Sequence, residues 1–292
     1  MEDILEKIEI DSKKVEELRS KLLIAKKVQL HTGIDGFYSP NVYGTYRNTG
    51  GECLGISKDS YTPMNLSMFL DVIVNSITEA DLDLDVEKLD YKEYKGGKKV
   101  TFDVPLQNFE IKSPMVGDIM ETKLVFKTGF DSLTKSSISY FTKRLWCSNG
   151  ASRWDGGYTV AFKNTKNNAD KYLSFTNEII QTKLDVSNYV EKLNDLVLKP
   201  VSQEKLDLFY LSMFGINRTT YAEAHKKSQN IFDAINAAVA IESANTGSNL
   251  FSLLQGATRY FTHNLAEEEG DLMFANPAVL NQRAHELVFS MS

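Results

Sequence analysis

The chain has 292 residues, of which 42% are hydrophobic and 25% are charged, and its formal net charge is −6 at pH 7. This is ordinary globular composition, and the length suits one large domain or two medium ones. No window approaches the roughly 18 consecutive apolar residues of a membrane span, and the N-terminus opens with Met-Glu-Asp, the wrong sign for a secretory signal. We therefore expect a soluble, cytoplasmic protein with no membrane partner.

The first 44 residues predict one helix and a connecting arm. Asp11 or Ser12 can cap this helix, and its apolar stripe recurs at helical spacing as Val15, Leu18 and Leu22. We interpret it as a docking or oligomer helix.

Short extended runs and turns then predict two hairpins and a helix. Residues 46–57 form two runs around Gly50 and Gly51, which indicates a β-hairpin. Asn65 is a suitable cap for a helix whose apolar face is Leu66, Phe69, Leu70, Ile73 and Ile77. Residues 88–93 and 100–104 flank the segment Lys95-Gly-Gly-Lys-Lys99, which predicts a second hairpin with a cationic tip.

Residues 122–128 and 137–146 predict two more strands, although residue 137 also suits a helix start. After Gly157 the pattern turns helical. One predicted helix ends just before Gly215, two further helices follow it along the chain, and Pro277 begins the last helix. Strands followed by helices predict an α+β protein, with an N-terminal antiparallel sheet of hairpins and a packed helix, and then a helical C-terminal half. We divide it into 1–44, 45–168 and 169–292, which we expect to be one continuous domain.

A search for catalytic and metal-binding patterns finds little. The sequence has no GxxxxGK[ST], GxSxG or HExxH motif. The run from Asp81 to Asp85 places three carboxylates on one strand face, which suits a hard cation, but a solvated strand end is the interpretation we favour. His263 and Glu267 have helical ligand spacing, yet two ligands make no site. We expect no cofactor and no metal.

The two cysteines, Cys53 and Cys147, have neither CxxC nor Cys/His spacing. A disulfide framework and a structural zinc site are therefore not indicated. We expect buried free thiols.

The most informative stretch is a basic island with aromatic residues. From Glu121 to Lys171 there are nine Lys or Arg and four Asp or Glu, a local charge of +5, so the rest of the chain carries −11. Proteins that bind single strands combine a cationic groove for phosphates with aromatic faces that stack bases. The candidate nucleic-acid-binding residues are Lys98, Lys99, Lys123, Lys127, Lys143, Arg144, Trp146 and Arg153. The alternative is that Trp146 is a core residue and that the cations are simply solvated.

Four segments in order resemble the phage and plasmid-like family known as domain of unknown function 932. They are residues 46–57 with 61–65, Leu145-Trp-Cys-Ser-Asn-Gly150, residues 245–263, and Asn281-Gln-Arg-Ala-His-Glu-Leu287. The chain departs from the family at its His-Asp-Gly loop, which reads Gly129-Phe-Asp-Ser-Leu here, and at Gly247, where tryptophan is usual. If the loop histidine has a function in the family, this chain lacks that function.

The resemblance implies a mobile-element protein, and its α+β outline is similar at fold level to single-strand annealing proteins of the beta-protein and RecT type. We therefore expect a non-enzymatic, oligomeric protein that binds or anneals single-stranded DNA in recombination or replication, in the host cytoplasm if a phage encodes it. The alternative is a phage assembly scaffold with a protein partner. An enzyme using Asn149 and His263 is a third interpretation, which we disfavour because no nucleophile and base pair is visible.

Overall fold

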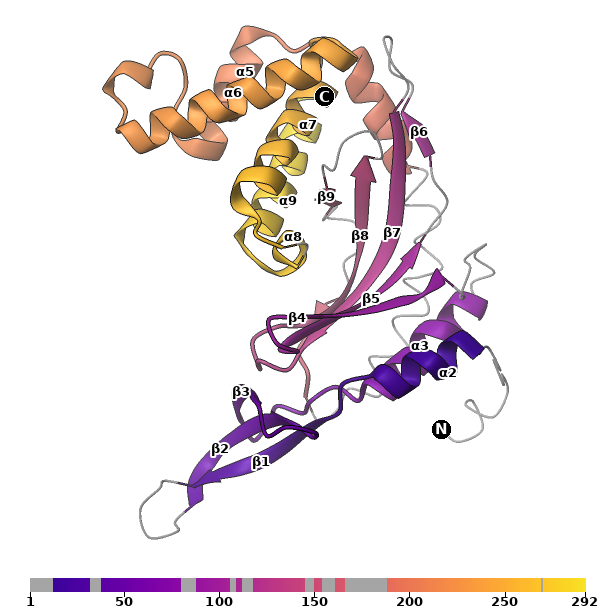
Figure 1. Ribbon diagram of the computed structural model, residues 1–292. Coiled ribbons are helices and arrows are strands. Elements are labelled where there is room, and N and C mark those ends of the chain that lie inside the picture. The colour runs from indigo at the N-terminus through magenta and orange to yellow at the C-terminus, as the bar shows by residue number, and fades with distance from the viewer. Residues whose placement is uncertain are drawn as a thin grey trace. The chain divides into compact units, whose positions relative to one another are not determined.

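The computed structural model describes residues 13–31, 38–79, 88–105, 109–111, 118–144, 150–153, 161–165, 188–268 and 270–292. The chain is α+β, with antiparallel sheets followed by a mostly helical C-terminal half, which confirms the predicted fold class (Figure 1). It divides into two compact units, one built around the N-terminal strands and the other around the C-terminal helices. The domain boundaries drawn from the sequence remain a prediction.

The first helix, α2 (Lys13–Lys21), buries Val15 and Leu18 as predicted. A three-stranded antiparallel sheet follows, with the order β1 (Ala25–His31), β2 (Tyr38–Arg47) and β3 (Cys53–Lys58). The β2–β3 turn contains Gly51 at a φ of 67°, which confirms the predicted hairpin. The strand β1 lies where a connecting arm was predicted, so that prediction is wrong. The register shifts once in each pairing, between Gln29 and His31 and between Thr45 and Tyr46.

The helix α3 (Leu66–Glu79) begins where predicted, because Oδ1 of Asn65 accepts hydrogen bonds from the backbone N–H groups of Ser67 and Met68 at 3.1 and 3.3 Å. The larger sheet then forms. Its order is β10 (Ala161–Phe162), β8 (Ser136–Arg144), β7 (Asp118–Gly129), β5 (Lys99–Pro105) and β4 (Asp90–Tyr94); in addition, β6 (Phe109–Ile111) pairs with β7, and β9 (Gly150–Arg153) pairs with β8. These strands confirm the second hairpin and exclude a helix at residue 137.

Aromatic packing joins α3 to one face of this sheet. The ring of Phe69 lies edge-on to Phe102 of β5 and Phe126 of β7, with centroids 5.8 and 6.4 Å away. All three side chains are fully buried. Because Phe102 and Phe126 are paired in register, their shared face is the hydrophobic side of the sheet.

Residues 188–268 and 270–292 are helical apart from short turns, as predicted, but the two-residue strand β10 lies after Gly157, where helix was expected. A helix through residues 188–198 precedes the other elements, which are α5 (Gln203–Phe214), η2 (Tyr221–Glu223), α6 (Lys226–Thr246), α7 (Leu250–Tyr260), the π-helical turn η3 (Phe261–Leu265), α8 (Asp271–Phe274) and α9 (Asn276–Ser290). Gly215 ends α5 with a φ of 69°, and Pro277 lies in the first turn of α9. None of the helices in the described ranges is long and apolar enough to cross a membrane.

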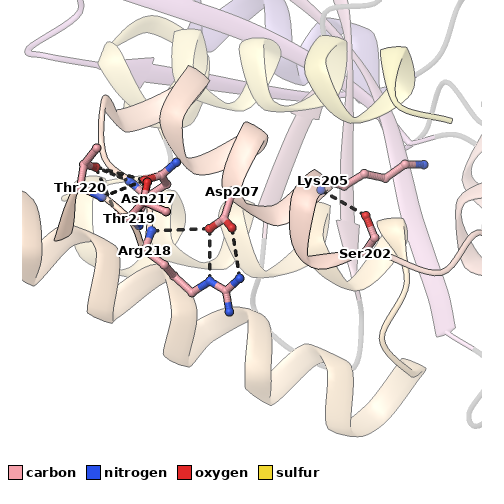
Figure 2. A network of polar contacts seen from close by, with 7 residues as sticks. All are labelled: Ser202, Lys205, Asp207, Asn217, Arg218, Thr219 and Thr220. Carbon is pink, nitrogen blue, oxygen red and sulfur yellow. Dashed lines mark hydrogen bonds and ion pairs between the residues drawn. The ribbon is translucent and has the colours of Figure 1, made fainter.

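Polar contacts fix both ends of α5 (Figure 2). At its start, the backbone N–H of Lys205 donates to Oγ of Ser202 at 3.3 Å. In the loop beyond its end, Arg218 forms an ion pair at 3.1 Å with Asp207 of α5, and Oδ1 of Asn217 accepts hydrogen bonds from the backbone N–H groups of Thr219 and Thr220. The Arg218 side chain is 53% exposed, so this pair stabilises the fold only slightly.

The helices α6 and α7 approach each other closely at Gly256. A Cβ atom at this position would lie 2.5 Å from the backbone Cα of Val239 and 2.7 Å from its nitrogen. Atoms at these distances overlap, so the absence of a side chain sets how closely these two helices pack.

We predict that Gly256→Ala destabilises the protein, because backbone atoms of α6 must move to admit the methyl group. The expected loss in the free energy of unfolding is about 1–3 kcal/mol, measured by urea denaturation. Gly50→Ala is the control, because a Cβ there meets no atom within 4 Å. Equal stability of the two variants would contradict the prediction.

Candidate nucleic-acid interface

Lys98 and Lys99 belong to the β4–β5 hairpin, as predicted. Lys98 is exposed at the tip, where its carbonyl oxygen accepts a hydrogen bond from the backbone N–H of Phe130 at 2.7 Å. Lys99 is the first residue of β5 and is half-buried. Among the four candidate lysines of β5, β7 and this hairpin, Lys98 is therefore the one best placed to meet a phosphate.

Lys123 of β7 lies beside a buried carboxylate. Its ammonium is 2.7 Å from Oδ2 of Asp103, and the ammonium of Lys92 is 3.2 Å from the same oxygen. The Asp103 side chain is only 4% exposed and that of Lys123 13%. The charge of Lys123 is thus largely compensated within the sheet.

Lys127 of β7 is buried, with 5% of its surface exposed. Burial lowers its pKa well below the ordinary lysine value, and the nearby positive charge of Lys99 lowers this pKa further. A buried lysine of this kind is a poor phosphate ligand, because a ligand would have to reach it through the packed sheet. Burial therefore argues against a direct contact of Lys127 with nucleic acid.

The remaining candidates lie on or near two paired strands. The β8–β9 register pairs Lys143 with Gly150 and Tyr140 with Arg153, and Arg144 is the next residue of β8. Because positions alternate between the two faces of a strand, Arg144 and Arg153 belong to one face of the sheet and Lys143 to the other. These two strands contain three cations and no Asp or Glu. Trp146 lies outside the described residues, as do Cys147 and Trp154.

The metal-binding candidates gain no support. The Asp81–Asp85 run lies outside the described residues. His263 lies in the π-helical turn η3, and both partial burial and the charge of Arg259 lower its pKa. Within the described ranges, no group of three or more His, Cys, Asp or Glu side chains is arranged to hold a metal ion.

The three-stranded sheet has a basic character that was not predicted. Strands β1, β2 and β3 contain Lys26, Lys27, Arg47 and Lys58, and they contain no Asp or Glu. The ammonium of Lys27 donates to three backbone carbonyl groups, at 2.6 to 3.1 Å, and Arg47 forms an ion pair with Glu93. Lys26 and Lys58 are exposed. The absence of acidic residues over three strands was the signal that could have identified this surface.

Cys53 corrects one further expectation. It is a free thiol, as predicted, but it is exposed on β3 instead of buried. Cys53 is the first residue of an outer strand, so neighbouring residues of the sheet cover its side chain only in part.

Comparison of the chain with protein-family models, with curated proteins and with solved structures finds no match.

We predict that Asp103→Asn destabilises the protein, because the two lysines then share a buried site without a carboxylate. The expected loss in the free energy of unfolding is about 2–4 kcal/mol, measured by urea denaturation. Asp207→Asn is the matched control, since it breaks a pair whose arginine is exposed and should cost less than about 1 kcal/mol. Indistinguishable losses in the two variants would refute the assigned role of Asp103.

Proposed function

We propose that this chain is a non-enzymatic protein of a phage or related mobile element that binds single-stranded DNA and promotes annealing as a homo-oligomer in the cytoplasm. The observation that carries the proposal is the β8–β9 pairing, which joins two strands that contain Lys143, Arg144 and Arg153 and no acidic residue. Exposed Lys98 is a further cation. The resemblance to domain of unknown function 932 is the source of the mobile-element assignment.

Annealing requires no catalytic group. Two strands repel each other through their phosphates, and a protein that neutralises both backbones while leaving base edges accessible lowers the barrier to pairing. Extended strands that contain cations suit this task, because their backbone geometry matches that of an extended single strand of nucleic acid.

The net charge of −6 does not oppose this activity. Affinity for nucleic acid depends on phosphates neutralised locally more than on the total charge. In an oligomer, the basic ladders of successive subunits add up along one strand, so that several weak contacts give tight binding.

A protein-interaction scaffold is the second candidate, and exposed apolar residues of α5 favour it. Leu208 and Leu211 are 52% and 46% exposed and lie three residues apart on one helix. Light scattering with and without a long single strand separates the two functions. Assemblies that form only with DNA support annealing, whereas DNA-independent complexes with another protein support the scaffold.

We predict that Lys143→Ala with Arg144→Ala weakens binding of a labelled single-stranded oligonucleotide about tenfold at low salt and reduces the salt slope of log K by about 1.4, because two phosphate contacts are lost. Fluorescence anisotropy over a salt series measures both quantities. Unchanged affinity at low salt would overturn the assignment of these residues.

Two control variants sharpen that experiment. Lys226→Ala with Lys227→Ala removes the same charge from two exposed residues at the start of α6, so it reports the effect of net charge alone. Lys127→Met removes a buried lysine. Both controls are expected to keep the oligonucleotide affinity of the unmodified protein within about twofold.

A further inference from the structure

One face of the three-stranded sheet carries an exposed apolar row. The register places Val28 of β1 and Ile56 of β3 on either side of Gly44 of β2 (Figure 1 shows the three strands). Paired residues share a face, so these three positions form one line across the sheet. Val28 is 50% exposed and Ile56 is 60% exposed. Apolar side chains this open, side by side on a sheet, mark an interaction surface.

The ring of Tyr46 covers the middle of this row. A Cβ atom on Gly44 would lie 2.4 Å from Cε2 and 2.9 Å from Cζ of Tyr46, so the outer part of the ring lies directly over Gly44. Gly44 is buried on a face where its neighbours are exposed, which this ring explains. The glycine leaves room for the outer end of the ring over the strand, where Tyr46 is half-buried.

Cations flank the aromatic ring. Lys26 lies directly opposite Tyr46 in the β1–β2 register, and Lys58 follows Ile56 by two residues and so shares its face. Both lysines are exposed. Since the three strands contain no Asp or Glu, the surface is complementary to a polyanion.

The opposite face of the same sheet is packed, which holds this surface in place. Thr45 and Ser57 are buried there. A Cβ atom on Gly55 would lie 2.6 Å from Cα of Asp131, and Oγ of Ser132 donates a hydrogen bond to the carbonyl oxygen of Ile56 at 2.7 Å. The ring of Tyr46 is therefore presented by a backbone that is anchored from behind.

We propose that this face is a base-stacking platform for single-stranded nucleic acid. A base stacks on the exposed part of the Tyr46 ring, Val28 and Ile56 contact the neighbouring bases or sugars, and Lys26 and Lys58 hold phosphates on either side. The choice of ligand rests on the proposed function, but the platform uses residues distinct from the β8–β9 cations.

The test measures affinity of the full chain for a labelled oligothymidylate at low salt. Tyr46→Ala is expected to weaken binding at least fivefold, the lower end of the effect of losing one stacked base. Tyr46→Phe keeps a ring and is expected to bind as the unmodified protein does. Gly44→Ala displaces the ring through its flexible outer end and is expected to weaken binding as well, while its thermal midpoint shows that the fold persists.

A second readout is position-specific. An oligonucleotide carrying 5-iodouracil crosslinks on irradiation to aromatic side chains stacked against it, and peptide mapping is expected to identify Tyr46. Normal affinity of Tyr46→Ala, together with crosslinks only at other residues, would overturn the platform while leaving the β8–β9 proposal standing.

If the unmodified protein binds no oligonucleotide at low salt, both proposals fail. Self-association that is lost in Tyr46→Ala without a change in oligonucleotide affinity would assign this face to a second copy of the chain and would also overturn the platform.

Discussion

The packing of Phe69 onto Phe102 and Phe126 determines how the central strands present their other residues. Successive side chains of a strand lie on opposite faces of the sheet. Because Phe102 and Phe126 lie on the face that packs against α3, the odd-numbered residues of β5 and β7 lie on the other face. This is why Lys123 lies against Asp103 and why its charge is compensated. The hydrophobic register, and not the charge pattern, decides which lysines of these strands remain available to a ligand.

The distribution of acidic residues separates two kinds of strand. Where β4 and β5 contain Asp or Glu, lysines pair with them, as Lys92 does with Asp103. Strands β1–β3 and β8–β9 contain cations without acids. Because the net charge of the whole chain is −6, the residues outside these acid-free strands together carry a charge more negative than −6. Under the proposed function, such a surface repels a polyanion in most orientations and directs it to the acid-free strands.

Much of the element order was predictable because its signals are local. The Asn65 cap and the glycine turns each specify structure within a few residues. The strand β1 was missed because Lys27 does not follow a simple alternation of apolar and polar residues: its ammonium donates to three carbonyl groups at and beyond the end of β3. The burial of Lys127 and the covering of Gly44 by Tyr46 depend on neighbouring strands and on side-chain direction. No single segment of sequence contains that information.

The register shifts in the three-stranded sheet have a consequence for how copies of the chain meet in solution. A short sheet with two outer strands offers unpaired N–H and C=O groups on both sides, and a flat edge of this kind recruits further strands into aggregates. Here each outer strand, β1 and β3, has one irregularity in its pairing with β2. Such irregularities bend and twist an edge, so it makes a poor template for lateral growth. An exposed sheet surface can thus stay open to a ligand at high protein concentration without seeding fibrils.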